Sequence, residues 1–383
     1  MRGHVRKRGK TWCFIIELSR DASGKRQQKW MSGYSTCKQA EAALATTLSD
    51  LHRGTYIEPS AKLVSEFLVS WLKDYADHNC EAKTTEKYEQ VIRNQVIPAI
   101  GQLKLKDLKP AHIQKLYSDA LSCGRVNGKG GLSSRSVHHM HRILSNALNT
   151  AVKWQLLAHN PVKATTPPKP EKQEMTALSA EQSNKVLKLL EGKNLWLPVF
   201  LGLTTGMRRG EILGLQWKDI NWDRKELSVK RSLKQSKTGV KLARPKTAHS
   251  LRTISLSDVV MEILRSHKRI QAEERLRLGS AYTAGGMVLA APGGGFLRPD
   301  SVSTAFAAFI KLQRGLPKVR FHDLRHTHAS LLFQAGENPK VVSQRLGHAN
   351  VAFTLDTYAH LMPGMETGAA LKIESLFGSA GAK

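Results

Sequence analysis

Acidic residues are scarce in this sequence, and their scarcity limits the partners that the protein can attract. The 383 residues include 31 Asp and Glu against 59 Lys and Arg, which gives a formal net charge of +28. A surface with this excess attracts polyanions and repels basic proteins, so nucleic acid is the leading candidate partner. A basic surface that serves only solubility is the alternative. An anionic membrane would favour an amphipathic basic helix, and none stands out.

Cysteines and long apolar runs are also few. The four cysteines are scattered, without a CxxC pair or the short spacing of a disulfide scaffold: Cys13, Cys37, Cys80 and Cys123. The N-terminal stretch MRGHVRKRGK is charged where a signal peptide is apolar. The longest strongly apolar run, Leu195 to Met207, is too short to cross a bilayer. The sequence therefore predicts a soluble protein of the reducing cytoplasm.

Residues 1–58 have the pattern of a small basic β-sheet with one helix. Nine basic residues stand against two acidic ones in residues 1–30. Residues 11–18 are rich in β-branched and aromatic side chains, a turn-forming segment follows at residues 21–24, and residues 26–31 complete a hairpin. Thr36 and Gln39 form a capping box for a helix that ends before Gly54. This domain either lays its sheet in a DNA groove or adds only nonspecific phosphate contacts.

The rest of the chain is predicted to be mainly helical. Apolar residues at helical spacing indicate a four-helix module at residues 59–164, and the proline-rich residues 165–174 are typical of an extended linker. Residues 175–383 combine helices with short strands between Leu227 and Leu256. The expected fold class is mainly α with small β-sheets. Several domains are expected, because 383 residues exceed one core of roughly 150 residues.

The first chemical motif is Thr205-Gly-Met-Arg-Arg-Gly-Glu211, which follows an apolar helix. Its glycine permits a bend that presents Arg208 beside a buried element. A guanidinium there can bind two oxygens of a phosphate, and Glu211 can fix its orientation. An Arg–Glu pair on the surface is the simpler interpretation of this motif taken alone.

The second motif is His322-Asp-Leu-Arg325-His-Thr-His. His322 and Arg325 are three residues apart, so on a helix they share one face that suits an anion. A metal site is the competing interpretation, because His322 and His326 have i,i+4 spacing. No carboxylate or cysteine completes a ligand set, however, and the HExxH base is missing.

The last two motifs are ordinary when taken separately. Gly347 in Leu346-Gly-His348 can end a helix and leave His348 at a turn. Tyr358 in Thr354-Leu-Asp-Thr-Tyr358 lies on a predicted short helix, where a tyrosine is usually a core residue. Neither residue alone indicates a function.

In this order, the four motifs resemble those of the tyrosine recombinases, also called phage-type integrases. The resemblance places the family's two arginines, two histidines and nucleophile on five residues without departure: Arg208, Arg325, His322, His348 and Tyr358. It also implies a catalytic lysine in a β-hairpin between the arginine motifs. Lys246, in Pro245-Lys-Thr-Ala-His-Ser-Leu-Arg, is our choice, and Lys237 in Ser236-Lys-Thr-Gly is the rival.

The resemblance implies a reaction without cofactor, metal or ATP. The arginines and histidines would stabilise the charge that gathers on a phosphodiester under attack, or a histidine would accept the tyrosine proton. Tyr358 would form a 3′-phosphotyrosine, and Lys246 would protonate the departing 5′-oxygen. Strand exchange at a mobile element or prophage is the implied function, with a type IB topoisomerase or a catalytically silent DNA-binding regulator as alternatives.

The resemblance also implies an architecture and a set of partners. Residues 1–58 look like an arm-site DNA-binding domain, residues 59–164 like a core-site DNA-binding domain, and residues 175–383 like the catalytic domain. The implied partners are double-stranded DNA with core-type and arm-type sites, a homotetramer, a DNA-bending host factor and an excision-directing factor, in a bacterial cytoplasm. The tail at residues 364–383 docks either on a partner or on its own domain.

Overall fold

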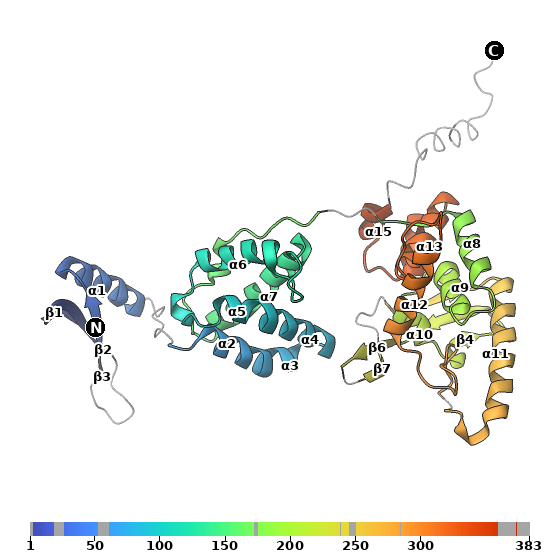
Figure 1. The fold of residues 1–383 in the computed structure, drawn as a ribbon, viewed down its shortest axis with the longest axis horizontal. Coiled ribbons are helices and arrows are strands. Elements are labelled where there is room, and N and C mark those ends of the chain that lie inside the picture. The colour runs from blue at the N-terminus through green and yellow to red at the C-terminus, as the bar shows by residue number, and fades with distance from the viewer. Residues whose placement is uncertain are drawn as a thin grey trace, which may run out of the picture. The chain divides into compact units, whose positions relative to one another are not determined.

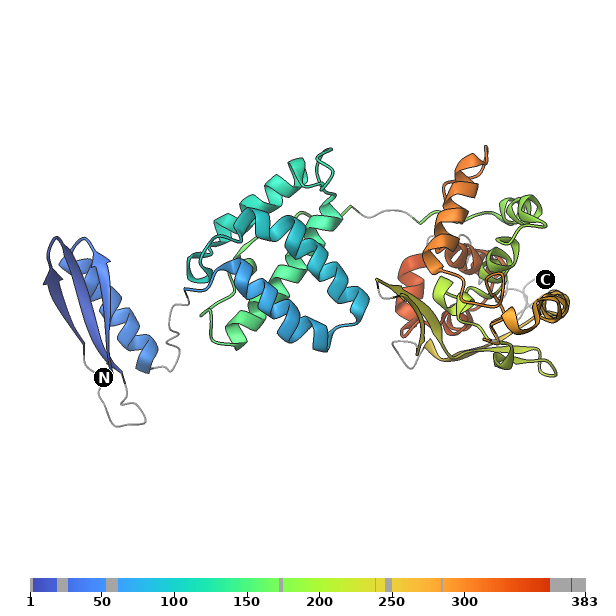
Figure 2. The ribbon, with the colours of Figure 1, turned by 60° about the horizontal axis from the view of Figure 1, so that its bottom comes forward.

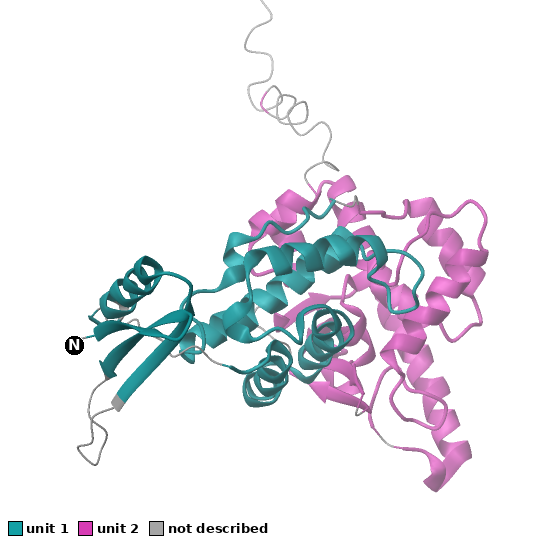
Figure 3. Ribbon diagram, turned by 60° about the vertical axis from the view of Figure 1, so that its left-hand side comes forward, with its two compact units in different colours: residues 1–172 teal, residues 173–383 magenta. Residues whose placement is uncertain are grey.

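The computed structural model of the protein describes residues 3–18, 27–52, 61–171, 175–237, 239–244, 250–283, 285–358 and 373. The chain divides into two compact units, residues 1–172 and residues 173–383 (Figure 3). Helices predominate in both, and the sheets are small and antiparallel, as the sequence predicted. The division falls inside the predicted linker, while the three predicted domain boundaries stay a prediction.

The N-terminal part of the first unit is a three-stranded antiparallel sheet of order β1-β2-β3. Its strands are β1 (Gly3–Arg8), β2 (Thr11–Leu18) and β3 (Gln27–Tyr34). Helix α1 (Cys37–His52) packs against this sheet (Figures 1 and 2). Thr36 Oγ1 accepts a hydrogen bond from the Gln39 backbone N–H at 3.3 Å, as a capping residue should. The predicted hairpin and helix are confirmed; β1 was not predicted, and the predicted turn at residues 21–24 lies outside the described residues.

The other part of the first unit is the predicted helical module. Two of its helical runs contain a π-helical turn, and 3-10 turns flank the others: α2 (Val64–Trp71), η1 (Leu72–Ala76), α3 (Asp77–Asn79), α4 (Ala82–Val91), η2 (Ile92–Val96), α5 (Ile97–Ile100), η3 (Leu105–Asp107), α6 (Pro110–Cys123), α7 (Ser134–Lys153) and η4 (Pro161–Ala164). Trp71 is buried at the centre, where its indole N–H donates to Thr150 Oγ1 at 3.1 Å. Its ring stacks on Tyr75 and Tyr88. The apolar periodicity therefore forms one core, as predicted.

The second unit is built around an apolar helix. Its elements are α8 (Ala180–Leu190), α9 (Trp196–Thr205), α10 (Arg209–Leu213), η5 (Trp217–Asp219), β4 (Ile220–Asn221), β5 (Glu226–Val229), β6 (Ser232–Ser236), β7 (Gly239–Ala243), β8 (Arg252–Ser255), α11 (Asp258–Leu278), η7 (Gly279–Ala281), α12 (Pro299–Leu312), α13 (Asp323–Gln334), α14 (Pro339–Leu346) and α15 (Val351–Tyr358). Helix α9 is buried on nearly all sides, as its apolar composition requires, and α13 packs directly on it. Helices α14 and α15 pack against each other and against α13 (Figure 1).

The strands of the second unit form two small antiparallel sheets. Strands β4, β5 and β8 make one sheet in the order β4-β5-β8, and β6 pairs with β7 (Figure 2). The predicted strands between Leu227 and Leu256 are therefore confirmed, and β4 adds a short strand that the sequence did not reveal. Pairing of β5 with β8 sets Val229 opposite Arg252. This register brings Arg252 from the far end of the strand segment toward the arginine motif on α10.

Candidate active site

A left-handed glycine fixes the bend before Arg208. Gly206 ends α9 with φ 65°, and a Cβ at this position would lie 2.5 Å from the His328 ring. Only glycine combines this backbone conformation with so close a neighbour. The chain then turns, and Arg208 becomes the N-cap residue of α10. The bend that the sequence predicted is thus present.

Glu211 holds two arginines in place. Its buried carboxylate accepts hydrogen bonds from the Arg208 backbone N–H at 2.9 Å, from Arg208 Nη1 at 2.9 Å and from Arg252 Nη2 at 2.8 Å. Burial would raise the pKa of Glu211, but the hydrogen bond and charge of Arg252, together with Arg208, outweigh it and leave that pKa lowered. The predicted Arg208–Glu211 contact is therefore part of a larger ion-pair network, not a surface pair.

Removing this carboxylate is expected to destabilise the fold. Glu211→Leu leaves two cations near each other without their shared partner, so the free energy of unfolding in urea should fall by about 3 kcal/mol. The lowered pKa of Glu211 means that its contribution is present above its ordinary pKa of 4.5 and is lost as pH falls. The free energies of unfolding of the wild type and the variant should therefore become more similar in acid.

An exposed ion pair provides the control for that experiment. Asp300 pairs with Arg209 at 3.2 Å, and its side chain is 55% exposed. Asp300→Asn should cost no more than about 1 kcal/mol, because solvent screens such pairs. Equal losses for both variants would show that Glu211 does not bind its arginines more strongly than a surface carboxylate would.

Arg325 is the buried cation of the site. Its side chain is 3% exposed, and Nη1 donates to the Gly206 carbonyl at 2.9 Å. Its Nη2 has no hydrogen-bond partner within the part of the chain that the structure describes. Burial, then the charges of Arg208 and Arg252, lower its pKa to about 9, so it remains protonated at neutral pH. A buried charged donor with no partner among the described residues is well suited to bind an anion.

Two predicted histidines lie close to this cationic group. Surrounding protein atoms lower the pKa of the exposed His322 ring by desolvation, and Arg325 lowers it further. Burial lowers the pKa of His348 to about 4, with Arg325 and Arg208 adding to the effect. His348 lies just after Gly347, whose φ is 71°, and its Nδ1 lies 2.7 Å from Thr354 Oγ1. Both rings are therefore neutral at pH 7 and have one N–H each to donate.

Tyr358 is the last described residue of α15, and its ring is 1% exposed. It packs in a small apolar cluster with Phe333 and Leu346. Burial raises the pKa of Tyr358 to about 12, against the opposing effect of the Arg325 charge. Its hydroxyl lies 2.6 Å from His326 Nδ1. The tyrosine is thus both a core residue and a neighbour of the cationic site.

The structure brings together five of the six predicted site residues. Lys246 lies outside the described residues, and its assignment stays a prediction. Lys237 lies at the turn between β6 and β7, with an exposed side chain. Sequence reasoning missed Arg252 and His326, which contact Glu211 and Tyr358. The sequence signal for His326 was its position directly after Arg325. From the sequence, His326 was considered only as a metal ligand.

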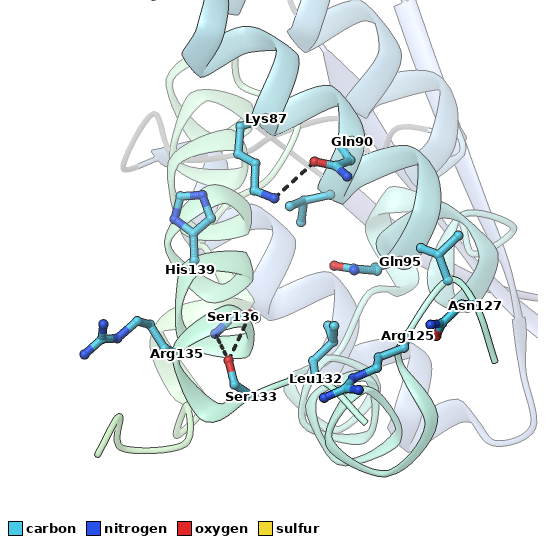
Figure 4. A pocket seen from close by; sticks show the side chains of 12 residues that line it. Lys87, Gln90, Gln95, Arg125, Asn127, Leu132, Ser133, Arg135, Ser136 and His139 are labelled. Atoms are coloured by element: carbon cyan, nitrogen blue, oxygen red, sulfur yellow. Dashed lines mark hydrogen bonds between the residues drawn. The ribbon is translucent and has the colours of Figure 1, made fainter. Parts of the chain in front are cut away.

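A basic cleft lies in the helical module (Figure 4). It has a volume of about 620 Å³, and its lining side chains come from α4, η2, α7 and the segment between α6 and α7. Three of the lining residues are cationic, Lys87, Arg125 and Arg135, and none of the described residues lining it is acidic. Glutamine, asparagine and serine side chains add hydrogen-bonding groups beside these cations. Such a surface suits a nucleic-acid backbone.

The described chain lacks both a metal-ligand cluster and a membrane-spanning helix. No group of three or more His, Cys, Asp and Glu side chains there is placed to hold a metal ion. The rings of His322 and His326, which have the i,i+4 spacing of a metal pair, lie perpendicular with centroids 5.4 Å apart. None of the described helices is long and apolar enough to cross a membrane.

Three family profiles match successive parts of the chain. The phage integrase family matches residues 173–364, the N-terminal SAM-like domain of phage integrases matches residues 63–121, and the Arm DNA-binding domain matches residues 4–51. The matched regions follow the order that the sequence resemblance implied. The first of them contains the arginine, histidine and tyrosine motifs.

Curated relatives match over most of the chain. The tyrosine recombinase XerC-like protein of Caldanaerobacter subterraneus subsp. tengcongensis is 29% identical over 97% of this chain and 98% of its own. The ICEBs1 integrase of Bacillus subtilis is 31% identical over 78% of this chain and 80% of its own. The chain therefore belongs to the phage integrase family and is a tyrosine recombinase.

Solved structures share the fold. The Tn1549 transposon integrase in complex with transposon right end DNA is 20% identical, with a TM-score of 0.66 over 82% of this chain and 100% of its own. A lambda integrase tetramer bound to a Holliday junction is 21% identical, with a TM-score of 0.54 over 90% of this chain and 95% of its own. The expected fold class is thereby confirmed.

Proposed function

We propose that this recombinase integrates and excises a mobile element by cutting DNA with Tyr358. The observation that carries the proposal is the buried Arg325 guanidinium, whose Nη2 lacks a partner among the described residues and whose charge acts on Tyr358. A phosphodiester that paired with this nitrogen would be bound by the same guanidinium whose charge acts on Tyr358. The relatives support the assignment, since they include the integrase of ICEBs1 and the integrase of transposon Tn1549.

The cationic site would perform the chemistry by electrostatic stabilisation. A phosphodiester under attack gathers negative charge on its nonbridging oxygens, and fixed donors lower the energy of that state. Arg325 and Arg208 would bind these oxygens, with Glu211 and Arg252 holding Arg208 in position. His322 and His348 are neutral donors beside them. The products would be a 3′-phosphotyrosine and a free 5′-hydroxyl, and the reverse attack by another strand would rejoin the DNA.

DNA binding would use the two parts of the first unit. The cleft lined by Lys87, Arg125 and Arg135 would contact the backbone of a core-type site. The N-terminal sheet would bind arm-type sites, as its match to the Arm DNA-binding domain suggests. Four strand cuts need four tyrosines, so a homotetramer on paired sites is proposed, by analogy with the lambda integrase tetramer on its junction. A bacterial cytoplasm, a DNA-bending host factor and an excision-directing factor complete the proposal.

A suicide substrate tests the proposed function. The core site is first located by sequencing the junctions of the element that carries the gene, and a nick is then placed so that the cleaved strand is lost. We expect a covalent protein–DNA adduct in EDTA, and peptide mass spectrometry should locate it on Tyr358. An adduct on another residue, or one that needs added divalent metal, would contradict the proposal.

The proton donor is tested by comparing two lysine variants. We propose Lys246 as the general acid, so Lys246→Ala should slow cleavage by about 10²-fold or more, because the 5′-oxygen then leaves without a proton. Lys237→Ala, on the neighbouring β6–β7 turn, is the matched variant and should cleave within about threefold of wild type. Selective loss of cleavage in the Lys237 variant would reverse the assignment.

A further inference from the structure

His326 makes a direct hydrogen bond to the atom that attacks DNA in the proposed function. Its Nδ1 lies 2.6 Å from Tyr358 Oη, and the two ring centroids are 5.9 Å apart. Phe333 packs against the tyrosine ring with a centroid distance of 5.6 Å. Because α13 carries both His326 and Phe333, one rigid helix sets both the position of the tyrosine ring and the direction of its hydroxyl.

His348 and His328, two further described histidines near the site, have other hydrogen-bond partners, while His322 contacts the His326 ring edge-on. His348 Nδ1 contacts Thr354 Oγ1 at 2.7 Å. His328 donates through Nδ1 to the Leu203 carbonyl, so its Nε2 accepts the hydrogen bond from Arg345. Both of these rings are therefore oriented by groups other than the tyrosine. Among the described histidines, His326 is the one that shares a hydrogen bond with Tyr358 Oη.

We infer that His326 is the general base that takes the proton of Tyr358 when the tyrosine attacks the phosphodiester. The inference rests on the proposed function of Tyr358 and assigns its missing proton acceptor. In the tautomer with its proton on Nε2, His326 accepts the Tyr358 O–H through Nδ1. As the Oη–P bond forms and the P–O5′ bond breaks, the tyrosine proton moves to Nδ1. The 5′-oxygen leaves with its electron pair and is protonated by the general acid, and rejoining reverses these transfers.

The surroundings of His326 keep its ring able to accept this proton. Burial, and then the neighbouring His322, lower the pKa of His326 to about 4. Arg325 and Arg320 also lower this pKa, and Asp323 raises it. The remaining facing groups are His348 and Tyr358, from the segments packed on α13. At neutral pH the ring is therefore uncharged. As the phosphate gains charge during attack, it favours the imidazolium beside it.

A substrate with a sulfur leaving group isolates this proton transfer. When sulfur replaces the bridging 5′-oxygen at the cleavage site, the strand departs as a thiolate, which needs no proton at neutral pH. Single-turnover cleavage of this DNA then reports attack by Tyr358 without the general acid. With His326 neutral, the wild-type rate should be nearly constant from about pH 6 to pH 9.

His326→Asn separates proton transfer from positioning, because its amide oxygen can accept the same hydrogen bond but cannot take the proton. We expect cleavage at pH 7 to fall by about 10²-fold. The remaining rate should rise about tenfold per pH unit, since hydroxide must then ionise a tyrosine whose pKa is about 12. His322→Ala is the matched control: it removes a proposed phosphate donor, so its rate should be low without this pH dependence.

Two results would overturn the inference and leave the proposed function intact. One is a His326→Asn variant with the wild-type rate and profile, which would show that the ring only positions the hydroxyl. The other is a wild-type cleavage rate that itself rises tenfold per pH unit. This measurement uses the wild type alone, so it does not depend on whether a variant folds. Failure of the proposed function is distinguishable, because Tyr358→Phe would then still form an adduct with the same DNA.

Discussion

Tyr358→Phe should bind core-site DNA like the wild type and form no covalent adduct with it. The substitution removes one oxygen atom, which is both the proposed nucleophile and the partner of His326. The remaining ring still fills the cluster with Phe333 and Leu346, so the fold should lose little stability. Loss of a covalent nucleophile is among the largest effects that one substitution can have, and we expect cleavage to fall by more than about 10⁴-fold.

The measurement compares adduct yield and DNA affinity in the same preparation. Tyr282→Phe is the matched control, because Tyr282 lies in the loop after η7 and contacts none of the proposed site residues through a described hydrogen bond. Its adduct yield should equal that of wild type. A normal adduct with Tyr358→Phe would remove Tyr358 from the mechanism, whereas loss of DNA binding in that variant would show that the hydroxyl supports the fold.

Arg325→Lys should lower the cleavage rate by about 10³-fold while retaining the positive charge. The guanidinium donates to the Gly206 carbonyl through Nη1, and Nη2, which has no partner among the described residues, is the proposed phosphate donor. A lysine ammonium is a single point donor, so it cannot keep both contacts in this fixed geometry. Loss of one preorganised donor to a transition-state oxygen costs 10² to 10³ in rate, and the change in position adds to this.

Arg209→Lys, in the same motif as Arg208, is the control for this prediction. Arg209 donates to Pro299 O and Ser303 Oγ and pairs with Asp300. All three partners lie on α12, so Arg209 binds this helix and not the proposed site. Its cleavage rate should stay within about threefold of wild type. A comparable loss in both variants would mean that cleavage depends on arginine number and not on the buried position of Arg325.

The sequence predicted the elements better than it predicted their contacts. Apolar spacing located the helices, because each helix buries a face whose period is local. The apolar residues through Leu72–Ala76 and Ile92–Val96 keep the spacing of an α-helix, so this spacing gave no sign of the π-helical turns there. Strand β1 was not predicted, because its sequence GHVRKR is polar and most of its residues are exposed. It forms by pairing with β2, a neighbour that local composition does not encode.

The site shows the same division between local and tertiary information. The motif spacing and family resemblance indicated Arg208, Arg325 and Tyr358, and the structure gathers these residues in one unit. Arg252 reaches Glu211 only because β8 pairs with β5. His326 reaches Tyr358 only because α15 packs beside α13. Contacts across 41 and 32 positions of the chain depend on the closed fold, and a single sequence carries no direct signal for them.

Arg325 Nη2, which has no hydrogen-bond partner among the described residues, bears on the stability of the DNA-free protein. A charged donor shielded from water and lacking a partner raises the energy of the folded state, so the unliganded protein is less stable than its packing allows. Any anion that occupies the position relieves this strain, and ligand binding to the folded state raises the melting temperature by mass action. The recombinase should therefore have its highest melting temperature when it is bound to its target DNA.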